Sequence, residues 1–211
     1  MGMKRLAIRT GLLAAALAAW ATPGAAQGHG HSHGAVRADS VIRQWTPADA
    51  HFMSAMIGHH AQAVQMSRLA PTHGASPAVR RLADRIINAQ QDEIATMQRW
   101  LRARGQPVPE VGAKMEGMDH GAHHMPGMLT EAQMQQLDRA RGAEFDQLFL
   151  QLMIQHHRGA VAMVSQLFGT YGAGQDETVF KFASDVNVDQ VTEIARMENM
   201  LVDLVFGEGS R

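Results

Sequence analysis

The strongest constraint on the fold is an internal repeat. Residues 49–66 recur 97 residues later as residues 146–163, with Asp, Phe, Met-Ile, His-His, Ala-Val and Met kept in register. Residues 79–101 recur 100 residues later as residues 179–201, around a shared Glu-Ile-Ala-x-Met. The offset grows by only three residues, so we expect the second half of the chain to contain the same pair of elements with a slightly longer connection.

The repeated segments have the sequence signals of helices. Thr46 and Ser76 each precede a proline, which is the arrangement of an N-cap followed by Pro in the first turn. The third helix is expected to run without interruption from Thr130 to about Gly169, and the fourth to end at Gly207. Because each hairpin has one apolar face, two hairpins bury these faces against each other. The sequence therefore predicts an all-α four-helix bundle made of two duplicated helical hairpins.

The N-terminus has the pattern of a secretory signal peptide. A positively charged start precedes a short apolar stretch at residues 12–20, and Gly24-Ala25-Ala26 supplies small residues for cleavage. The alternative is an uncleaved membrane anchor. Either way we expect the rest of the chain to be exported to the periplasm or another extracytoplasmic space, with no further segment long enough to span a membrane. The predicted organisation is a signal peptide at 1–26, a His-rich tail at 27–45, a first hairpin at 46–106, a Met/His/Gly-rich linker at 107–129 and a second hairpin at 130–207, with both hairpins in one domain.

Polar residues interrupt the apolar face of each hairpin at repeated positions. At 100° per residue the two His-His pairs fall on the same face as neighbouring methionines, and polar side chains within an apolar face are costly unless they are paired. The predicted metal ligands of the bundle are His59, His60, His156, His157, Met56, Met66, Met153 and Met163. The residues expected to orient these imidazoles are Gln90, Glu93, Gln190 and Glu193. The alternative is a packed core in which methionines fill gaps and histidines bond to the glutamates.

The composition agrees with a soft metal as the ligand. The chain has 12 His, 15 Met and no Cys. Imidazole together with thioether suits Cu(I), whereas imidazole alone suits Cu(II) or Zn(II). We therefore expect copper, with Cu(I) favoured and Cu(II), Ag(I) or Zn(II) as alternatives. The sequence leaves open whether the two His pairs form one site or two.

The linker is a second candidate for metal binding. It carries four Met and three His within 14 residues, on a Gly-rich backbone where no core requires methionine. These residues are Met115, Met118, His120, His123, His124, Met125 and Met128. Thioether and imidazole groups on a flexible backbone can wrap a soft cation with little strain, and the alternative is a disordered spacer.

A third candidate depends on where the signal peptide is cut. Cleavage after Ala26 gives a mature chain that begins Gln27-Gly28-His29. Its amine, two amide nitrogens and the His29 imidazole would form a square-planar site for Cu(II) or Ni(II). The alternative is a plain His-rich tail.

Several other functions lack their sequence requirements. The chain contains no Glu-x-x-His, Gly-rich phosphate loop, nucleophile elbow or His-Glu-x-x-His, and no Cys. Lys plus Arg number 19 against 20 Asp plus Glu, so no basic field is available to hold nucleic acid. We therefore expect a protein that is not an enzyme and does not bind nucleic acid.

These motifs resemble a known family. The Met-Ile-x-His-His-x-x-Ala-Val segments, each preceded by Asp and Phe, are similar to those of domain-of-unknown-function family 305. So is the stretch that starts Met125-Pro-Gly-Met and leads to Glu144-Phe-Asp, and the likeness covers roughly residues 46–206. The resemblance implies a ferritin-like four-helix bundle, export and, as in studied relatives, copper binding with a part in copper resistance. The family's matching positions are Met56, His59, His60, Met66, Met153, His156, His157 and Met163.

The combined hypothesis is a non-catalytic periplasmic protein that buffers, sequesters or hands over copper or silver, with a partner among copper-handling proteins. One rival is a structural or interaction bundle whose His and Met serve packing. Another is a copper-dependent oxidase, which would need an open coordination position that the sequence does not indicate.

Overall fold

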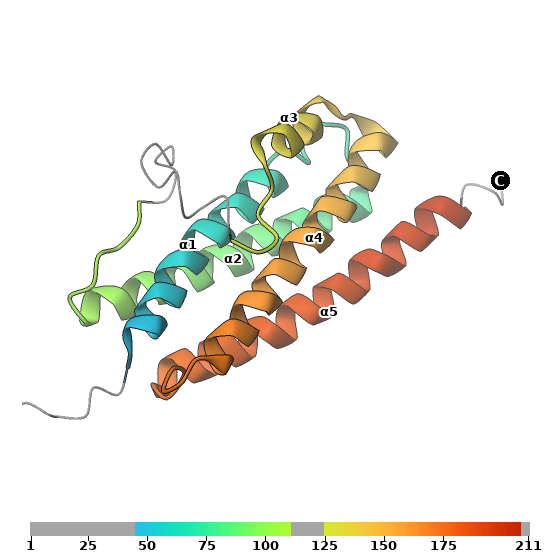
Figure 1. Cartoon of the computed structure of the whole chain (residues 1–211). Helices are drawn as coiled ribbons and strands as arrows, with labels where there is room; N and C mark the ends of the chain where they lie inside the picture. The colour runs from blue at the N-terminus through green and yellow to red at the C-terminus, as the bar shows by residue number, and fades with distance from the viewer. Residues whose placement is uncertain (1–44, 111–124, 208–211) are drawn as a thin grey trace, which may run out of the picture. The chain divides into compact units, whose positions relative to one another are not determined.

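The computed structural model describes residues 45–110 and 125–207, and this part of the chain is all-helical, with no strand. Its helices are α1 (Pro47–Ser67), α2 (Pro77–Ala103), α3 (Glu131–Arg139), α4 (Gly142–Gly169) and α5 (Glu177–Gly207) (Figure 1). None of these helices is long and apolar enough to cross a membrane.

The starts of α1 and α2 follow the predicted capping signals. The Thr46 hydroxyl accepts a hydrogen bond from the Asp49 amide (3.3 Å), and the Asp49 carboxylate accepts one from the Thr46 amide (2.7 Å), which completes a capping box. The Ser76 hydroxyl accepts from the Val79 amide (3.3 Å) at the start of α2. Both helices thus begin where the sequence predicts because the first free amides are satisfied locally.

The predicted third helix is wrong in one respect, since it consists of two helices. Ala140 has an extended backbone (ψ 147°) and Gly142 has a φ of +59°, so the chain turns between α3 and α4. The reason is a tertiary contact, in which the Gly142 amide donates to the His73 carbonyl (2.9 Å) and His73 Nε2 lies 2.9 Å from the Asp138 carbonyl oxygen. The described residues therefore contain five helices, one more than the four predicted.

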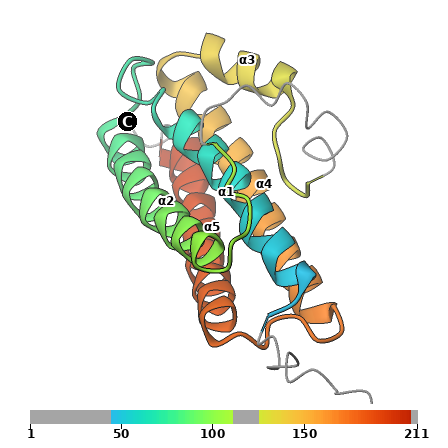
Figure 2. The ribbon, with the colours of Figure 1, turned by 90° about the vertical axis from the view of Figure 1, so that its left-hand side faces the viewer.

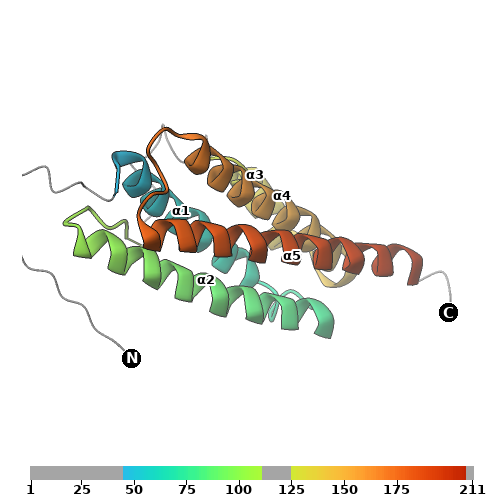
Figure 3. The same cartoon turned by 90° about the horizontal axis from the view of Figure 1, so that it is seen from below.

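The long helices pack as two hairpins. α1 packs against α2, α4 packs against α5, and α1 contacts α4 between them, whereas α3 contacts only α4 closely. Figure 2 shows the two hairpins and α3 at one end of them, and Figure 3 shows α2 and α5 running side by side. The α1–α4 contact is thus the centre of the bundle, flanked by α2 and α5.

Two repeated aspartates tie the hairpins together. The Gly174 amide, in the loop after α4, donates to Asp49 Oδ1 (2.7 Å) near the start of α1. In the same way the Ser76 amide, in the loop after α1, donates to both oxygens of Asp146 near the start of α4 (3.1 Å each). The start of each central helix therefore lies at the end of the other, which makes α1 and α4 antiparallel.

The apolar core forms two clusters along the α1–α4 contact. One includes residues 52–57 of α1 and 160–167 of α4. The other includes residues 63–66 of α1, Ala70 in the turn after it, and residues 145–154 of α4. The two His-His pairs fall between these segments in both helices, so the histidines form a polar layer between two apolar clusters.

Candidate metal centre

The four histidines of the repeat meet at the α1–α4 contact. The ring centroids of His59 and His156 are 3.8 Å apart, and each of these rings lies beside its sequence neighbour, at 6.5 Å for His60 and 6.3 Å for His157. All four residues are at most 1% exposed. The two pairs, which the sequence left as one site or two, therefore form a single buried layer, called the histidine layer below.

The outer two histidines contact the glutamates of the flanking helices. His157 Nε2 is hydrogen-bonded to Glu193 Oε2 of α5 (2.7 Å). His60 Nε2 lies 2.6 Å from Glu93 Oε2 of α2, an ion-pair distance without the alignment of a hydrogen bond. These are the two glutamates that the sequence predicts as orienting residues, and each is placed to fix the ring of one outer histidine.

The inner two histidines are held in the neutral form. Burial, followed by the neighbouring charge of His60, lowers the pKa of His59 to about 3. Burial, followed by His59 and His157, lowers the pKa of His156 well below its ordinary value of 6.5. A buried imidazole with no charged partner cannot keep a proton, because the charged ring would lose its solvation. Both inner rings are thus neutral at physiological pH, the state in which imidazole binds metals.

Ring nitrogens in the layer are left without partners. His59 Nε2 is hydrogen-bonded to the Pro126 carbonyl oxygen (3.0 Å), which makes this nitrogen the protonated one and leaves Nδ1 with a lone pair. Within the described part of the chain, both nitrogens of His156 and the Nδ1 atoms of His59, His60 and His157 have no hydrogen-bond partner. Buried polar atoms without partners are rare and point to an unfilled role such as ligand binding.

The four predicted methionines of the bundle lie on both sides of the histidine layer. Met56 and Met163 belong to one apolar cluster, and Met66 and Met153 belong to the other. Met163 is 6% exposed and the other three are fully buried. All four are packed as core residues in the clusters that flank the layer, so packing alone accounts for their positions.

The imidazoles and carboxylates alone do not form a ready metal site. Across residues 45–110 and 125–207, no group of three or more His, Asp or Glu side chains is arranged to hold a metal ion. A cation in the histidine layer would therefore need thioether ligands or a rotation of the rings. Mixed imidazole and thioether ligation suits Cu(I) and Ag(I) better than Zn(II).

A short segment at the end of the linker covers one side of the layer. Residues 125–129, called the strap, are clamped to α1 because the Gln62 amide group donates to the Leu129 carbonyl (3.0 Å) and accepts from the Leu129 amide (2.8 Å). Gly127 has a φ of +76°, and a Cβ built on it would lie 2.6 Å from the Cα of Gly159 in α4. Only glycine fits at either position, so the strap is seated directly on α4 beside His156.

Sequence reasoning missed the role of Gln62 and Gly159. The two residues occupy equivalent positions of the repeat, and both contact the strap. The available signal was the mismatch itself, a helical Gly where the first copy has Gln, within an otherwise matching segment.

The remaining predicted ligands divide into two groups. Met125 and Met128 lie in the strap, and Met125 is half-buried against the apolar cluster that contains Met56 and Met163. The predicted ligands that lie outside the described residues are Met115, Met118, His120, His123, His124 and His29.

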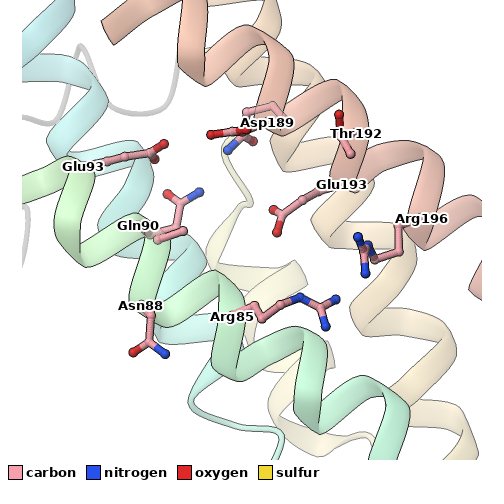
Figure 4. A pocket seen from close by; sticks show the side chains of 10 residues that line it. Arg85, Asn88, Gln90, Glu93, Asp189, Thr192, Glu193 and Arg196 are labelled. Carbon is pink, nitrogen blue, oxygen red and sulfur yellow. The ribbon is translucent and has the colours of Figure 1, made fainter.

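A pocket opens on the other side of the layer, between α2 and α5 (Figure 4). Its volume is about 430 Å³, and it is lined by Gln90 and Glu93 of α2 and by Asp189, Gln190 and Glu193 of α5. The two glutamines that the sequence predicts as orienting residues therefore lie at this pocket, and both are 2% exposed.

The fold and the site of the described residues define an all-helical domain with a buried layer of four histidines between methionine-containing clusters. The chain belongs to the family described as domain of unknown function (DUF305), whose sequence model matches residues 49–201. No curated protein matches this sequence.

Solved structures of this family share the fold. A DUF305 protein of Streptomyces coelicolor, described as secreted, is 31% identical, with a TM-score of 0.62 over 74% of this chain and 92% of that chain. A DUF305 fragment from Deinococcus radiodurans is 30% identical, with a TM-score of 0.62 over 74% and 97%. CopM in its Cu(II)-bound form is 29% identical, with a TM-score of 0.58 over 74% and 96%. CopM has also been solved with Cu(I) and with Ag bound.

Proposed function

We propose that the protein binds copper or silver in the histidine layer, without catalysis, and so buffers, sequesters or confers resistance to these metals outside the cytoplasm. The observation that carries the proposal is the set of four buried imidazoles, two of them neutral, with ring nitrogens that have no partner within the described residues. The copper- and silver-bound structures of CopM support it.

The proposal favours Cu(I) as the bound species. The imidazoles and carboxylates of the described residues do not converge as a set of three. Additional soft donors are available in the methionines of the two flanking clusters and in Met125 of the strap. Thioether sulfur is a soft ligand, which suits Cu(I) and Ag(I). Export rests on the signal-like residues 1–26 and on the secreted relative.

The proposed architecture behind this function is a ferritin-like four-helix bundle that arose by duplication of one hairpin. The repeated sequence segments and the matching ties through Asp49 and Asp146 support it. Under this proposal α3 is an addition to the second hairpin that packs against α4.

The competing function is a structural bundle in which the histidines serve only packing. The contacts of His60 and His157 with glutamates favour this reading, because Glu193 satisfies one nitrogen of the His157 ring and Glu93 lies at ion-pair distance from His60 Nε2. Replacing the histidines by Ala distinguishes the two functions. It should lower metal affinity if the protein binds metal, and it should change only stability if the histidines serve packing.

The test is titration of the mature protein with Cu(I) against a competing chelator, with stoichiometry from native mass spectrometry. We expect a defined number of tightly held ions in the wild type and loss of tight binding when His59, His60, His156 and His157 are replaced by Ala. Because four cavities could unfold the bundle, the pair His59→Ala and His156→Ala is measured in parallel, with helicity checked by circular dichroism.

The matched control is His73→Ala. His73 is also buried (5% exposed) and hydrogen-bonded, but it lies in the turn before α2, away from the histidine layer. The control should lose stability and keep metal affinity. Equal metal affinity in the wild type and in a folded His59→Ala, His156→Ala variant would contradict the proposed function.

A further inference from the structure

The buried histidine layer raises the question of how a cation reaches it. All four rings are at most 1% exposed, so a metal ion cannot bind from solvent without a path. On the strap side the approach to the histidine layer is closed. The Pro126 carbonyl accepts a hydrogen bond from His59 Nε2, and Gly127 is packed on Gly159. A cation entering there would have to displace backbone.

The opposite side presents polar side chains that contact both solvent and the histidines. The side chains of Glu93 and Glu193 are 17% and 20% exposed, and each has one carboxylate oxygen within 2.7 Å of an outer histidine. Both residues also line the pocket between α2 and α5 (Figure 4). These two carboxylates are therefore the last groups between the pocket and the layer.

The pocket has the polarity that attracts a cation. Asp189 lies with Glu93 and Glu193 on its wall. Partial desolvation, followed by the negative charges of Glu93, Asp185 and Glu193, raises the pKa of Asp189. Arg85 and Arg196 also line the pocket, and Figure 4 shows them together, away from Asp189 and Glu93. Three carboxylates against two guanidinium groups leave the pocket wall with a net negative charge, which concentrates positive ions.

An independent observation points to a ligand in the pocket. Gln90 is 2% exposed, lines the pocket, and its Oε1 has no hydrogen-bond partner among the described residues. A buried carbonyl oxygen without a donor is costly, and a passing cation or its water would satisfy it. The acidic wall and this oxygen together form a polar path that ends at the imidazoles.

We propose that the pocket between α2 and α5 is the access route by which a copper or silver ion reaches the histidine layer. The cation is first met by Glu93, Glu193 and the Gln90 oxygen, and then exchanges these oxygen ligands for the imidazoles that the same glutamates contact. Oxygen ligands hold soft ions weakly, which suits a place of passage rather than of storage. This inference rests on the proposed function and concerns the rate of binding.

The first test changes the charge of the pocket wall. Asp189→Lys reverses an exposed charge that touches no histidine, and Asp203→Lys makes the same change on α5 outside the pocket. Stopped-flow mixing with Cu(I) supplied as its cationic acetonitrile complex gives the association rate. We expect Asp189→Lys to slow association by about fivefold or more, as loss of electrostatic steering does, and Asp203→Lys to leave the rate within about twofold of the wild type.

The second test narrows the pocket. Ala89→Trp places a large side chain on its wall, and Gln91→Trp places one on the same helix outside it. A narrowed route slows association and release alike, so we expect Ala89→Trp to change both rates about equally and to leave the affinity unchanged. The Gln91→Trp control should leave both rates as in the wild type.

The outcomes separate the two proposals. A wild type that fails to bind copper overturns the proposed function and the route with it. Tight binding with unchanged association rates in both Asp189→Lys and Ala89→Trp overturns the route alone. Slower association in Ala89→Trp without slower release would mean that the pocket acts on the stability of the bound state, which also overturns the route.

Discussion

At the scale of residues, the central feature of the molecule is a pair of buried histidines that stay unprotonated. His59 and His156 lie 3.8 Å apart between ring centroids, a distance at which two protonated rings would repel strongly. Glu93 and Glu193 contact only the outer rings, so the inner pair has no carboxylate to support a proton. The neutral rings of the inner pair therefore have lone pairs available for a metal ion, whereas they resist protonation.

This neutrality predicts that the metal-free protein is less stable at acidic pH. The folded-state pKa of His59 is about 3, below its ordinary value of 6.5, so the unfolded chain binds the proton first. The stability that comes from the neutral ring is complete above about pH 6.5 and is lost as the pH falls towards 3. His59 should contribute a slope of about 1.4 kcal/mol per pH unit within this window. The lowered pKa of His156 acts in the same direction.

Urea unfolding at pH 7 and pH 5 checks this prediction in the presence of a metal chelator. A variant with His59→Leu and His156→Leu should lose much less stability between the two pH values. Similar losses in the wild type and in this variant would contradict the expected role of the inner pair.

Much of the histidine layer was predictable from the sequence, and the reason is the duplication. A polar pair that intrudes twice into an apolar face, opposite a glutamate that also recurs, indicates a buried polar contact whatever its purpose. The convergence of the two pairs could not be predicted, because the depth at which α1 crosses α4 depends on the packing of the side chains on both helices.

At the scale of elements, the strap is the part that no helical pattern indicates. Its conformation depends on a φ of +76° at Gly127 and on the space left by the missing side chain of Gly159. The break between α3 and α4 was missed for the same kind of reason. The Gly142 amide donates a hydrogen bond to the carbonyl of His73, a residue of the first hairpin. Local helix propensity carries no information about such a distant partner.

Gly159→Ala should therefore destabilise the protein although Ala favours helices. The new Cβ would lie 2.0 Å from the Pro126 carbonyl oxygen, so the strap or α4 must move. We expect a loss of about 1–3 kcal/mol, typical of an overpacked core. Thermal and urea unfolding give the change in stability.

Gly169→Ala is the matched control on the same helix. A Cβ at Gly169 meets nothing within 4 Å. This change should leave stability unchanged or raise it by up to about 1 kcal/mol, the helix preference of Ala over Gly. If both substitutions behave alike, the strap does not depend on the Gly127–Gly159 contact.

At the scale of the whole molecule, two equivalent aspartates join the hairpins. Asp49 and Asp146 are 0% and 2% exposed, and each accepts hydrogen bonds from the backbone of the opposite hairpin's loop. Buried hydrogen bonds to a charged group contribute more than neutral ones. These ties hold the start of each central helix at the end of the other, on either side of the histidine layer.

Asp146→Ala should lower the stability of the bundle by about 1.5–3 kcal/mol, because it leaves the Ser76 amide without its two acceptor oxygens. The exposed Asp185, paired with Lys181 in the same helix, is the control, and its replacement by Ala should cost no more than about 0.5 kcal/mol. Urea unfolding of both variants measures the difference, and equal losses would show that the tie between hairpins is not stabilising.

The strap has a consequence for how such a molecule can be assembled. Gln62 and Gly159 stand at equivalent positions of the repeat, yet one clamps the strap and the other makes room for it. An assembly of two identical hairpins would carry the same residue at both positions, and it could present two clamps or two gaps but never one of each. A strap that covers only one side of the histidine layer is therefore possible only in a single chain whose two copies have diverged.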